Sequence, residues 1–234
     1  MDAYRERFNA ATEADLRGLE GDVGCLTLGD YILRRSVPPN AGRVLDLGCG
    51  DGAVLKAIAR LRPDLECVGV DFAARLIERA RADCPPTVTF HVAELAGSLP
   101  EGLGSFDRIV SFSVLQYLAP EAVAELCRRL RGSLKSGGRI AHLSIPDLSK
   151  RLLMFQDSHL NVRPARTWFA GKLNLLHMAV VDLKRRLAGD CSYGDQGFFH
   201  DAEGLAARCS EHFQAIVLRP SDSWYRFDLV LDPK

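Results

Sequence analysis

Glycine and aspartate residues near position 50 have the types and the spacing needed to hold a nucleotide. Residues 44–52 read VLDLGCGDG, so an apolar run passes directly into a glycine-rich turn. A second apolar run ends in Asp71, 19 residues after Gly52. Glycines let a strand-to-helix turn fold tightly and let a ligand approach backbone N–H groups, and an acid at the end of the next strand can bind two ribose hydroxyls. This layout predicts a nucleotide site on a parallel sheet.

Two classes of ligand fit the glycine spacing. Gly48, Gly50 and Ala53 satisfy the GxGxxA pattern of a dinucleotide site. Asp46 distinguishes the two classes, because a carboxylate two residues before the turn repels a pyrophosphate but attracts a ligand that carries an ammonium and a sulfonium. Asp51, inside the loop, argues the same way. The sequence therefore favours the cationic ligand over the dinucleotide.

The same stretch resembles the (D/E)xGxGxG motif of class I S-adenosylmethionine-dependent methyltransferases. The motif positions are filled by Asp46, Gly48, Gly50 and Gly52. The resemblance covers roughly residues 40–145 and 213–231, and it implies S-adenosyl-L-methionine as the cofactor. It also implies that Asp46 orients the amino acid end of the donor and that Asp71 holds the ribose hydroxyls. The alternative role for both aspartates is to cap the helix that follows.

The resemblance implies further donor-binding residues. Phe72 is expected against the adenine edge, with a core aromatic as its alternative. The family commonly has an Asp where this chain has Ala93, so Glu94 is expected to supply the carboxylate from one residue along, and Leu95 a backbone N–H. The end of the fourth strand is expected beside the donor methionine. The full predicted cofactor-binding set is Asp46, Gly48, Cys49, Gly50, Gly52, Asp71, Phe72, Glu94, Leu95, Ser111, Phe112 and Gln116.

Methyl transfer depends mainly on in-line positioning, and an oxygen or protonated amine acceptor also requires a base. The candidate catalytic residues are His142, His200 and Tyr117. His142 lies in the expected fifth strand, so a buried core histidine is its alternative. His159 and His177 are further candidates. No set of His, Asp and Glu has metal-ligand spacing, so no metal is expected.

The alternation of apolar runs and helical patterns predicts one α/β domain over residues 1–234. Regular alternation implies a mainly parallel sheet with helices on both faces. The last two strands are joined by a connection too short for a crossover helix, so the last strand is expected to pair antiparallel. The family resemblance implies a Rossmann-like, seven-stranded sheet. Expected strands cover residues 44–47, 66–70, 87–92, 106–112, 138–144, 213–218 and 226–231; expected helices cover 53–61, 74–82 and 120–134, with N-terminal helices in 1–40 interrupted at 18–24.

Residues 145–200 are longer than a simple crossover requires. They can form amphipathic helices, and their lysines and arginines outnumber their acidic residues. By the family resemblance, this helical insertion is a lid over the acceptor site. The alternative is a structural cap or the surface of a homodimer.

The whole-chain composition limits the function classes. The 30 basic and 30 acidic residues of the 234-residue chain cancel, which argues against nucleic acid and membrane partners. The seven cysteines form no CxxC pair and suggest a reducing compartment. The N-terminus has no signal-peptide pattern, so a cytoplasmic protein is expected.

The sequence thus predicts an enzyme that methylates an O or N atom of a small molecule. The closing stretch, residues 223–231, is similar to the ends of bacterial methyltransferases that act on sugars or secondary metabolites. The basic insertion suits an anionic acceptor. Two alternatives remain: a nucleic-acid methyltransferase, and a non-catalytic protein that binds S-adenosylmethionine.

Overall fold

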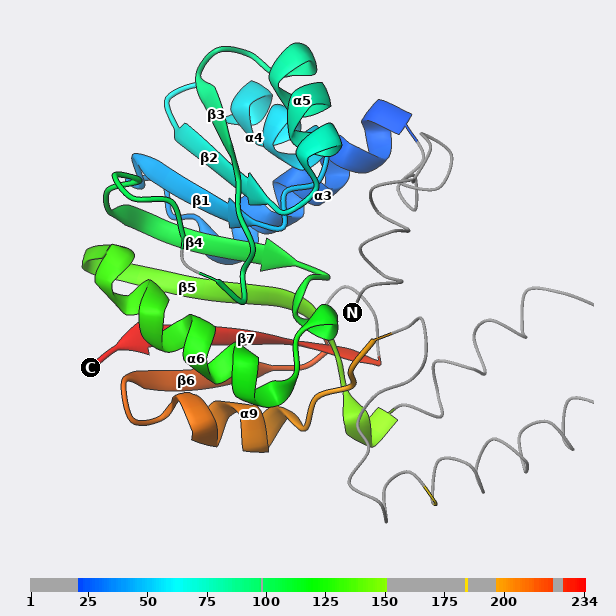
Figure 1. The fold of residues 1–234 in the computed structure, drawn as a ribbon, viewed down its shortest axis with the longest axis vertical. Coiled ribbons are helices and arrows are strands. Elements are labelled where there is room, and N and C mark those ends of the chain that lie inside the picture. The colour runs from blue at the N-terminus through cyan, green and yellow to red at the C-terminus, as the bar shows by residue number, and fades with distance from the viewer. Residues whose placement is uncertain (1–20, 98, 151–183, 185–196, 221–224) are drawn as a thin grey trace, which may run out of the picture.

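The computed structural model describes residues 21–97, 99–150, 184, 197–220 and 225–234. In these ranges the chain forms a seven-stranded sheet in the order β3-β2-β1-β4-β5-β7-β6 (Figure 1). Strands β1 to β5 are parallel to their neighbours, whereas β7 pairs antiparallel with both β5 and β6. The predicted fold class and the antiparallel last strand are confirmed. The strands are β1 (Arg43–Leu47), β2 (Glu66–Asp71), β3 (Val88–Val92), β4 (Phe106–Phe112), β5 (Leu134–Pro146), β6 (Phe213–Leu218) and β7 (Arg226–Pro233).

Helices cover both faces of this sheet and bury two separate apolar clusters. Side chains alternate between the faces, so in β1 Val44 packs in one cluster and Leu45 in the other. The cluster that contains Val44 lies under α3 (Gly21–Ser36), α4 (Ala53–Leu61) and α5 (Ala74–Asp83). The cluster that contains Leu45 lies under α6 (Pro120–Leu130) and α9 (Ala202–Cys209). Short 3-10 turns are η1 (Leu115–Tyr117), η2 (Arg131–Ser133) and η3 (Leu148–Lys150).

The boundaries around β5 differ from the prediction. The helix expected over 120–134 ends at Leu130, and β5 begins at Leu134 instead of Gly138. Phe106 pairs with Leu134 but Arg108 pairs with Arg139, so residues 135–138 form an irregularity inside the strand. A Cβ on Gly138 would lie 2.8 Å from the Lys135 carbonyl oxygen, which explains why glycine stands there.

The glycine break predicted near residues 18–24 is also wrong in part. Helix α3 already includes Gly21 and Gly24 and continues to Ser36. Packing against α4 outweighs the low helix propensity of glycine, since Leu28 and Ile32 are buried between the two helices. Gly29 makes the approach close, because a Cβ there would lie 3.1 Å from the Cβ of Ala57. Residues 1–20 lie outside the described residues.

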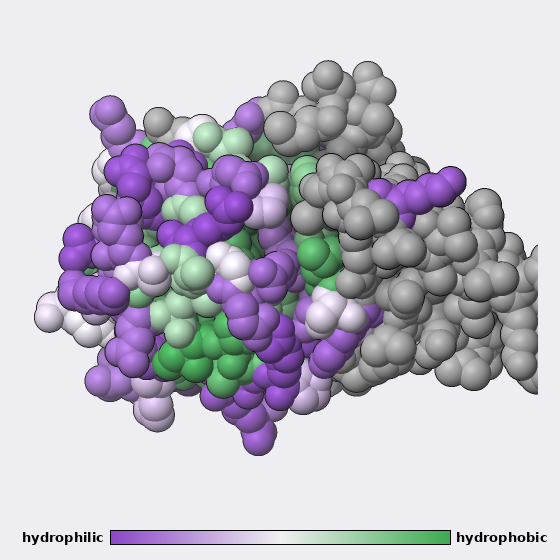
Figure 2. All heavy atoms as spheres, turned by 90° about the horizontal axis from the view of Figure 1, so that it is seen from below, coloured by the Kyte–Doolittle hydropathy of each residue, from purple (hydrophilic) through white to green (hydrophobic). Residues whose placement is uncertain are grey.

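None of the helices in the described ranges has the length and apolar character that a bilayer span requires. Seen from the side where Figure 1 places β6 and α9, much of the described surface is hydrophilic, and hydrophobic residues gather in the lower part of the view (Figure 2).

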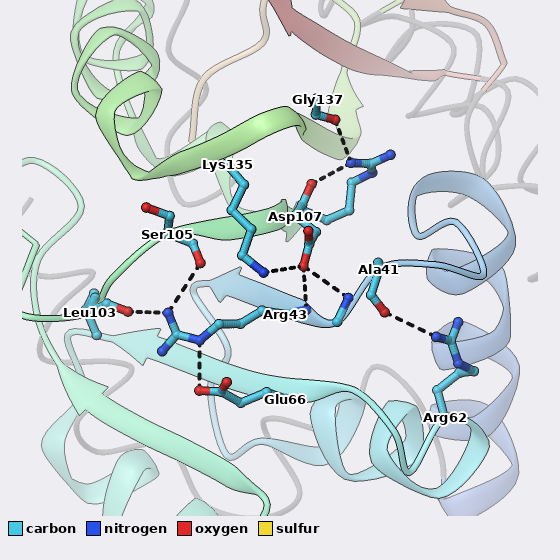
Figure 3. Close-up of polar contacts among 11 residues, drawn as sticks. Ala41, Arg43, Arg62, Glu66, Leu103, Ser105, Asp107, Lys135 and Gly137 are labelled. Carbon is cyan, nitrogen blue, oxygen red and sulfur yellow. Dashed lines mark hydrogen bonds and ion pairs between the residues drawn. The ribbon is translucent and has the colours of Figure 1, made fainter.

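Polar side chains tie together the amino ends of the central strands (Figure 3). Asp107 accepts hydrogen bonds from the backbone N–H of Gly42 and Arg43, at 3.0 and 2.8 Å, and from Lys135 Nζ at 2.9 Å. Arg43 in turn pairs with Glu66 at 2.8 Å. These contacts join β1, β2, β4 and β5 at the amino edge of the sheet, opposite the carboxyl edge where the glycine loop lies.

We expect Asp107→Ala to lower the free energy of unfolding by about 1–3 kcal/mol, because it removes three hydrogen bonds, one of them charged at both ends. Urea unfolding measures the effect. Glu125→Ala is the control, because Glu125 pairs with Arg128 on an exposed surface and its loss is expected to leave the free energy of unfolding nearly unchanged. Equal effects of the two variants would contradict a structural role for the Asp107 contacts.

Candidate functional site

The glycine loop follows β1 at the carboxyl edge of the sheet. Gly48, Gly50 and Gly52 all have positive φ, at 75°, 56° and 76°. Strand β2 anchors the loop, because the N–H groups of Gly48 and Cys49 donate to the Val70 carbonyl at 2.7 and 3.1 Å. Helix α4 then begins at Ala53, so its amino end faces the same space.

The three glycines are required for different reasons. A Cβ on Gly48 would lie 2.6 Å from Val114 Cγ2, and a Cβ on Gly52 would lie 2.8 Å from Phe90 Cζ. A Cβ on Gly50 would meet no atom within 4 Å. Gly48 and Gly52 therefore permit packing within the protein, whereas Gly50 borders the open space where a ligand would approach.

Asp46 is a buried carboxylate with no cation beside it. Its residue is 6% exposed, and its carboxylate accepts no hydrogen bond from any described residue. Burial, together with the nearby charge of Asp71, raises the pKa of Asp46 to about 8. The helix cap that was the alternative role is not formed, since Asp51 Oδ1 accepts the Ala53 N–H at 3.2 Å. Asp46 is thus prepared to receive a positively charged group.

Asp71 connects the two loops at the carboxyl ends of β1 and β2. Its Oδ2 accepts the Gly50 N–H at 3.0 Å, and its Oδ1 accepts the Ala73 N–H at 2.9 Å. Burial raises its pKa, and these backbone hydrogen bonds oppose the rise. Because each carboxylate oxygen has a second lone pair, the oriented side chain can still accept two hydroxyl groups.

Four other predicted donor-site residues lie near this pair in the sequence. Cys49 points away from the loop opening into the core below α4, and burial raises the pKa of its thiol, so only its backbone can face a ligand. Phe72 is half-buried directly after Asp71. Glu94 is exposed in the loop after β3, while Leu95 packs on the core cluster below α6. The loop containing Glu94 adjoins Asp71, because the Ala93 N–H donates to the Asp71 carbonyl at 2.9 Å.

The residues predicted at the end of β4 separate into two environments. Ser111 is buried, and its Oγ lies 2.8 Å from Nδ1 of His142. Nε2 of His142 lies 3.5 Å from Cys127 Sγ, so both ring nitrogens are occupied. Burial lowers the pKa of His142 to about 3, which keeps it neutral at physiological pH. This geometry favours the alternative of a buried core histidine over a base. Phe112 is half-buried, edge-on to Tyr31 with ring centroids 6.5 Å apart.

The remaining candidates, Gln116, Tyr117 and His200, lie where residues 197–200 return to the sheet. The Phe198 N–H donates to the Gln116 carbonyl at 2.6 Å. His200 is fully buried and donates from Nε2 to the Leu115 carbonyl at 2.9 Å; burial lowers its pKa. The predicted catalytic residues are His142, His200 and Tyr117. Of these, His142 and His200 are buried, and Tyr117 in η1 is half-buried. His159 and His177 lie outside the described residues.

The two ends of the predicted insertion meet beside this site. Asp147 and His200 form a parallel bridge, the Leu148 N–H donates to the His200 carbonyl at 2.9 Å, and the His200 N–H donates to the Pro146 carbonyl at 2.9 Å. Arg219 then holds Asp147 at 2.8 Å and Glu203 at 2.6 Å. We call this arrangement the junction. Apart from Lys184, residues 151–196 lie outside the described residues.

Sequence reasoning missed a polar cluster formed by Ser113, Ser144 and Arg226 at the carboxyl ends of β4 and β5. The Arg226 Nη1 donates to the Ser144 carbonyl at 2.6 Å and to both serine hydroxyls at 3.3 Å. The available signal was an arginine at the start of the last strand. No group of metal-ligating side chains occurs in the described ranges. A surface hollow of about 760 Å³ lies at the other edge, where β5 begins, and does not belong to this site.

Strand order separates this sheet from a dinucleotide-binding one. A dinucleotide Rossmann sheet has the order 3-2-1-4-5-6, whereas here β7 lies between β5 and β6. Residues 44–138 match a family model described as a methyltransferase domain. This range contains the glycine loop, Asp46 and Asp71.

Known proteins agree with that match. The chain is 34% identical over 115 residues to a ubiquinone biosynthesis O-methyltransferase of Xylella fastidiosa, covering 47% of this chain and 44% of that protein. It is 39% identical over 112 residues to a trans-aconitate 2-methyltransferase of Methylobacterium radiotolerans, covering 47% and 41%. The matched region thus spans less than half of either relative. Human N-acetylserotonin methyltransferase, solved with S-adenosylmethionine, shares the fold with a TM-score of 0.57 at 18% identity, covering 99% of this chain and 62% of that chain. Residues 44–138 therefore form a methyltransferase domain, and the strand order and the glycine motif around it resemble those of the class I S-adenosylmethionine-dependent methyltransferases.

Proposed function

We propose that this chain binds S-adenosylmethionine and transfers its methyl group to an oxygen or nitrogen atom of a small molecule. The observation that carries the proposal is Asp46, a buried carboxylate with a raised pKa and no cation among the described residues. Such a group is costly to ionise unless a ligand brings positive charge.

The residues present fit the proposed cofactor. Asp46 would hold the ammonium of the methionine end, and the open side of Gly50 would admit the ligand next to backbone N–H groups. Asp71, already oriented by two backbone hydrogen bonds, would hold the ribose hydroxyls. Phe72 and the loop containing Glu94 and Leu95 would border the adenine.

S-adenosylmethionine supplies, when bound, a methyl group on a good leaving group, so the protein's main task is to position the acceptor. Ser111 and His142 act through packing, because both are buried and hydrogen-bonded to each other. Tyr117, half-buried in η1, would contact an acceptor hydroxyl or its proton. The insertion, which enters and leaves through the junction, would close over the acceptor.

The acceptor class is supported by the relatives. The matched proteins are named for ubiquinone biosynthesis and for trans-aconitate, which are both small molecules. A sugar or a secondary metabolite remains within this class, and a cytoplasmic location remains part of the proposal.

Calorimetric titration with S-adenosylmethionine, S-adenosylhomocysteine and NAD tests the proposal. We expect micromolar binding of the first two ligands and none of NAD. Asp71→Ala is expected to weaken S-adenosylhomocysteine roughly 100-fold, since two charged hydrogen bonds to the ribose are lost. Asp64→Ala is the control, because Asp64 pairs with Arg62 on the exposed surface. Binding of NAD alone would move the protein to another class of enzyme.

A further inference from the structure

The polar cluster of Ser113, Ser144 and Arg226 lies directly beside the donor loop. Ser113 precedes Val114, the residue that packs on Gly48. Ser113 and Ser144 have φ of 55° and 60°, and no other non-glycine residue in the described ranges has positive φ. The two hydroxyl groups lie 3.2 Å apart. Adjacent strands β4 and β5 are thus both bent at their carboxyl ends, and the bends bring two serines under the same guanidinium.

Arg226 is anchored to this cluster through one nitrogen. Its Nη1 makes all three of its hydrogen bonds, to the Ser144 carbonyl and to the two hydroxyls. Its Nη2 and Nε donate to no acceptor among the described residues. The guanidinium carbon lies 5.4 Å from the ring centroid of Tyr225, and the residue is only half-buried. One edge of the guanidinium is therefore fixed, and no described residue accepts a hydrogen bond from the edge with Nη2 and Nε.

The charge of Arg226 is not balanced within the described structure. The nearby buried acid, Asp228, is already satisfied by Arg35 at 2.9 Å, by Tyr31 at 3.3 Å and by the Ser144 N–H at 3.0 Å. No carboxylate of the described residues lies within ion-pair distance of Arg226. A half-buried guanidinium whose two-donor edge meets no acceptor in the described part of the chain matches the geometry of a two-oxygen anion.

We propose that Arg226 is a specificity-determining residue that binds an oxyanion, a carboxylate or a phosphate, on the methyl acceptor. This inference rests on the proposed function and deepens it: the acceptor is an anionic small molecule that lies over the ends of β4 and β5. The serine pair acts as a positioning element, because it holds Nη1 and so turns the Nη2–Nε edge toward the acceptor. The neutral hydroxyls orient the guanidinium without cancelling its charge.

The test uses the whole chain saturated with S-adenosylhomocysteine. Benzoate, phenyl phosphate and the neutral analogue benzamide are titrated, and dissociation constants are measured by ligand-observed NMR. We expect at least one of the two anions to bind roughly tenfold or more tightly than benzamide. The anion that binds better identifies carboxylate or phosphate as the natural group. Arg226→Gln is expected to abolish the preference for the anion over benzamide, and Arg226→Lys is expected to retain part of it. Arg208→Gln, which removes an exposed partner of Glu121, is the control.

Two results would overturn the proposal: equal binding of anions and benzamide to the wild-type protein, or a preference that survives in Arg226→Gln. A second measurement needs no variant, because phenylglyoxal modifies arginine side chains. Mass spectrometry should show that the preferred anion protects Arg226 but not Arg208, and absence of protection would contradict the inference. Failure of the wild-type protein to bind S-adenosylhomocysteine, which is measured first, would instead contradict the proposed function.

Discussion

Asp46→Asn is expected to weaken S-adenosylhomocysteine binding roughly 30-fold or more at pH 7.5 while making the unliganded protein more stable. Both effects have one cause. The carboxylate of Asp46 is buried beside Asp71 without a cation, so its ionised form favours the liganded protein and disfavours the empty one. An amide of the same shape removes the unfavourable charge and the favourable attraction together.

The effect on stability depends on pH with a definite sign. The pKa of Asp46 is about 8 in the folded protein, against an ordinary value of 3.8. The folded state therefore binds the Asp46 proton more tightly than the unfolded state does. The stability that this protonation provides is complete below pH 4 and is lost as the pH rises to about 8. The free energy of unfolding of Asp46→Asn, minus that of the wild type, should rise by up to about 1.4 kcal/mol per pH unit across this window. Urea unfolding at several pH values measures the difference, and a flat difference would contradict the assigned pKa.

The proton on the Asp46 carboxyl should also be detectable in ligand-binding experiments. Between pH 5.5 and 7.5, the wild-type protein must release a proton from Asp46 when it binds a cationic ligand, so its affinity rises with pH. Calorimetry in buffers of different ionisation enthalpy measures this release. Asp46→Asn should release none from this site, and if proton release were equal in the two proteins, Asp46 would not be the group that meets the ligand's charge.

Alanine substitutions at Gly50 and Gly52 are expected to have opposite consequences. Gly52→Ala places a Cβ 2.8 Å from Phe90 and 3.0 Å from the Cβ of Ala80, at a φ of 76°, and should cost about 2–4 kcal/mol of stability. Gly50→Ala meets nothing within 4 Å and should cost only about 1 kcal/mol, from its left-handed backbone. The same Gly50→Ala change fills the open side of the loop and should weaken S-adenosylhomocysteine roughly tenfold or more, because the ligand must approach the backbone there.

Urea unfolding and calorimetry on both variants separate the two roles. A Gly50→Ala protein with normal ligand affinity would show that the ligand does not approach this side of the loop. A Gly52→Ala protein as stable as the wild type would show that Phe90 moves away at little cost. The pair is informative because the two glycines belong to one motif, and the motif alone does not distinguish them.

Much of the fold could be predicted from the sequence because its determinants are local. Apolar runs bounded by turns gave β1 to β4 within a residue or so, and the short connection after Leu218 indicated the antiparallel β7. The end of α6 could not be predicted, because the residues that follow Leu130 are recruited into a 3-10 turn and then pair with β4. That pairing is set by a distant strand and leaves little trace in the local pattern.

The donor half of the site was more predictable than the acceptor half for the same reason. Asp46, Gly50 and Asp71 lie within one β-α-β segment, so their spacing in sequence fixes their proximity. Ser144 and Arg226 are brought together by the antiparallel pairing of β5 and β7, with a register shift between His142 and Ile145. His142 shows the limit clearly, since a histidine in a strand has the same sequence pattern whether it faces the core or a ligand.

The junction between Asp147 and His200 bears on whether the segment between these two residues can be replaced. The segment between these residues enters and leaves the sheet at a single bridged point, with Arg219 fastening it from outside. Its replacement by a segment of different length and sequence leaves the register of every strand untouched. If the segment covers the acceptor, as proposed, its exchange in the laboratory should change substrate preference and leave the methyl-donor site unchanged.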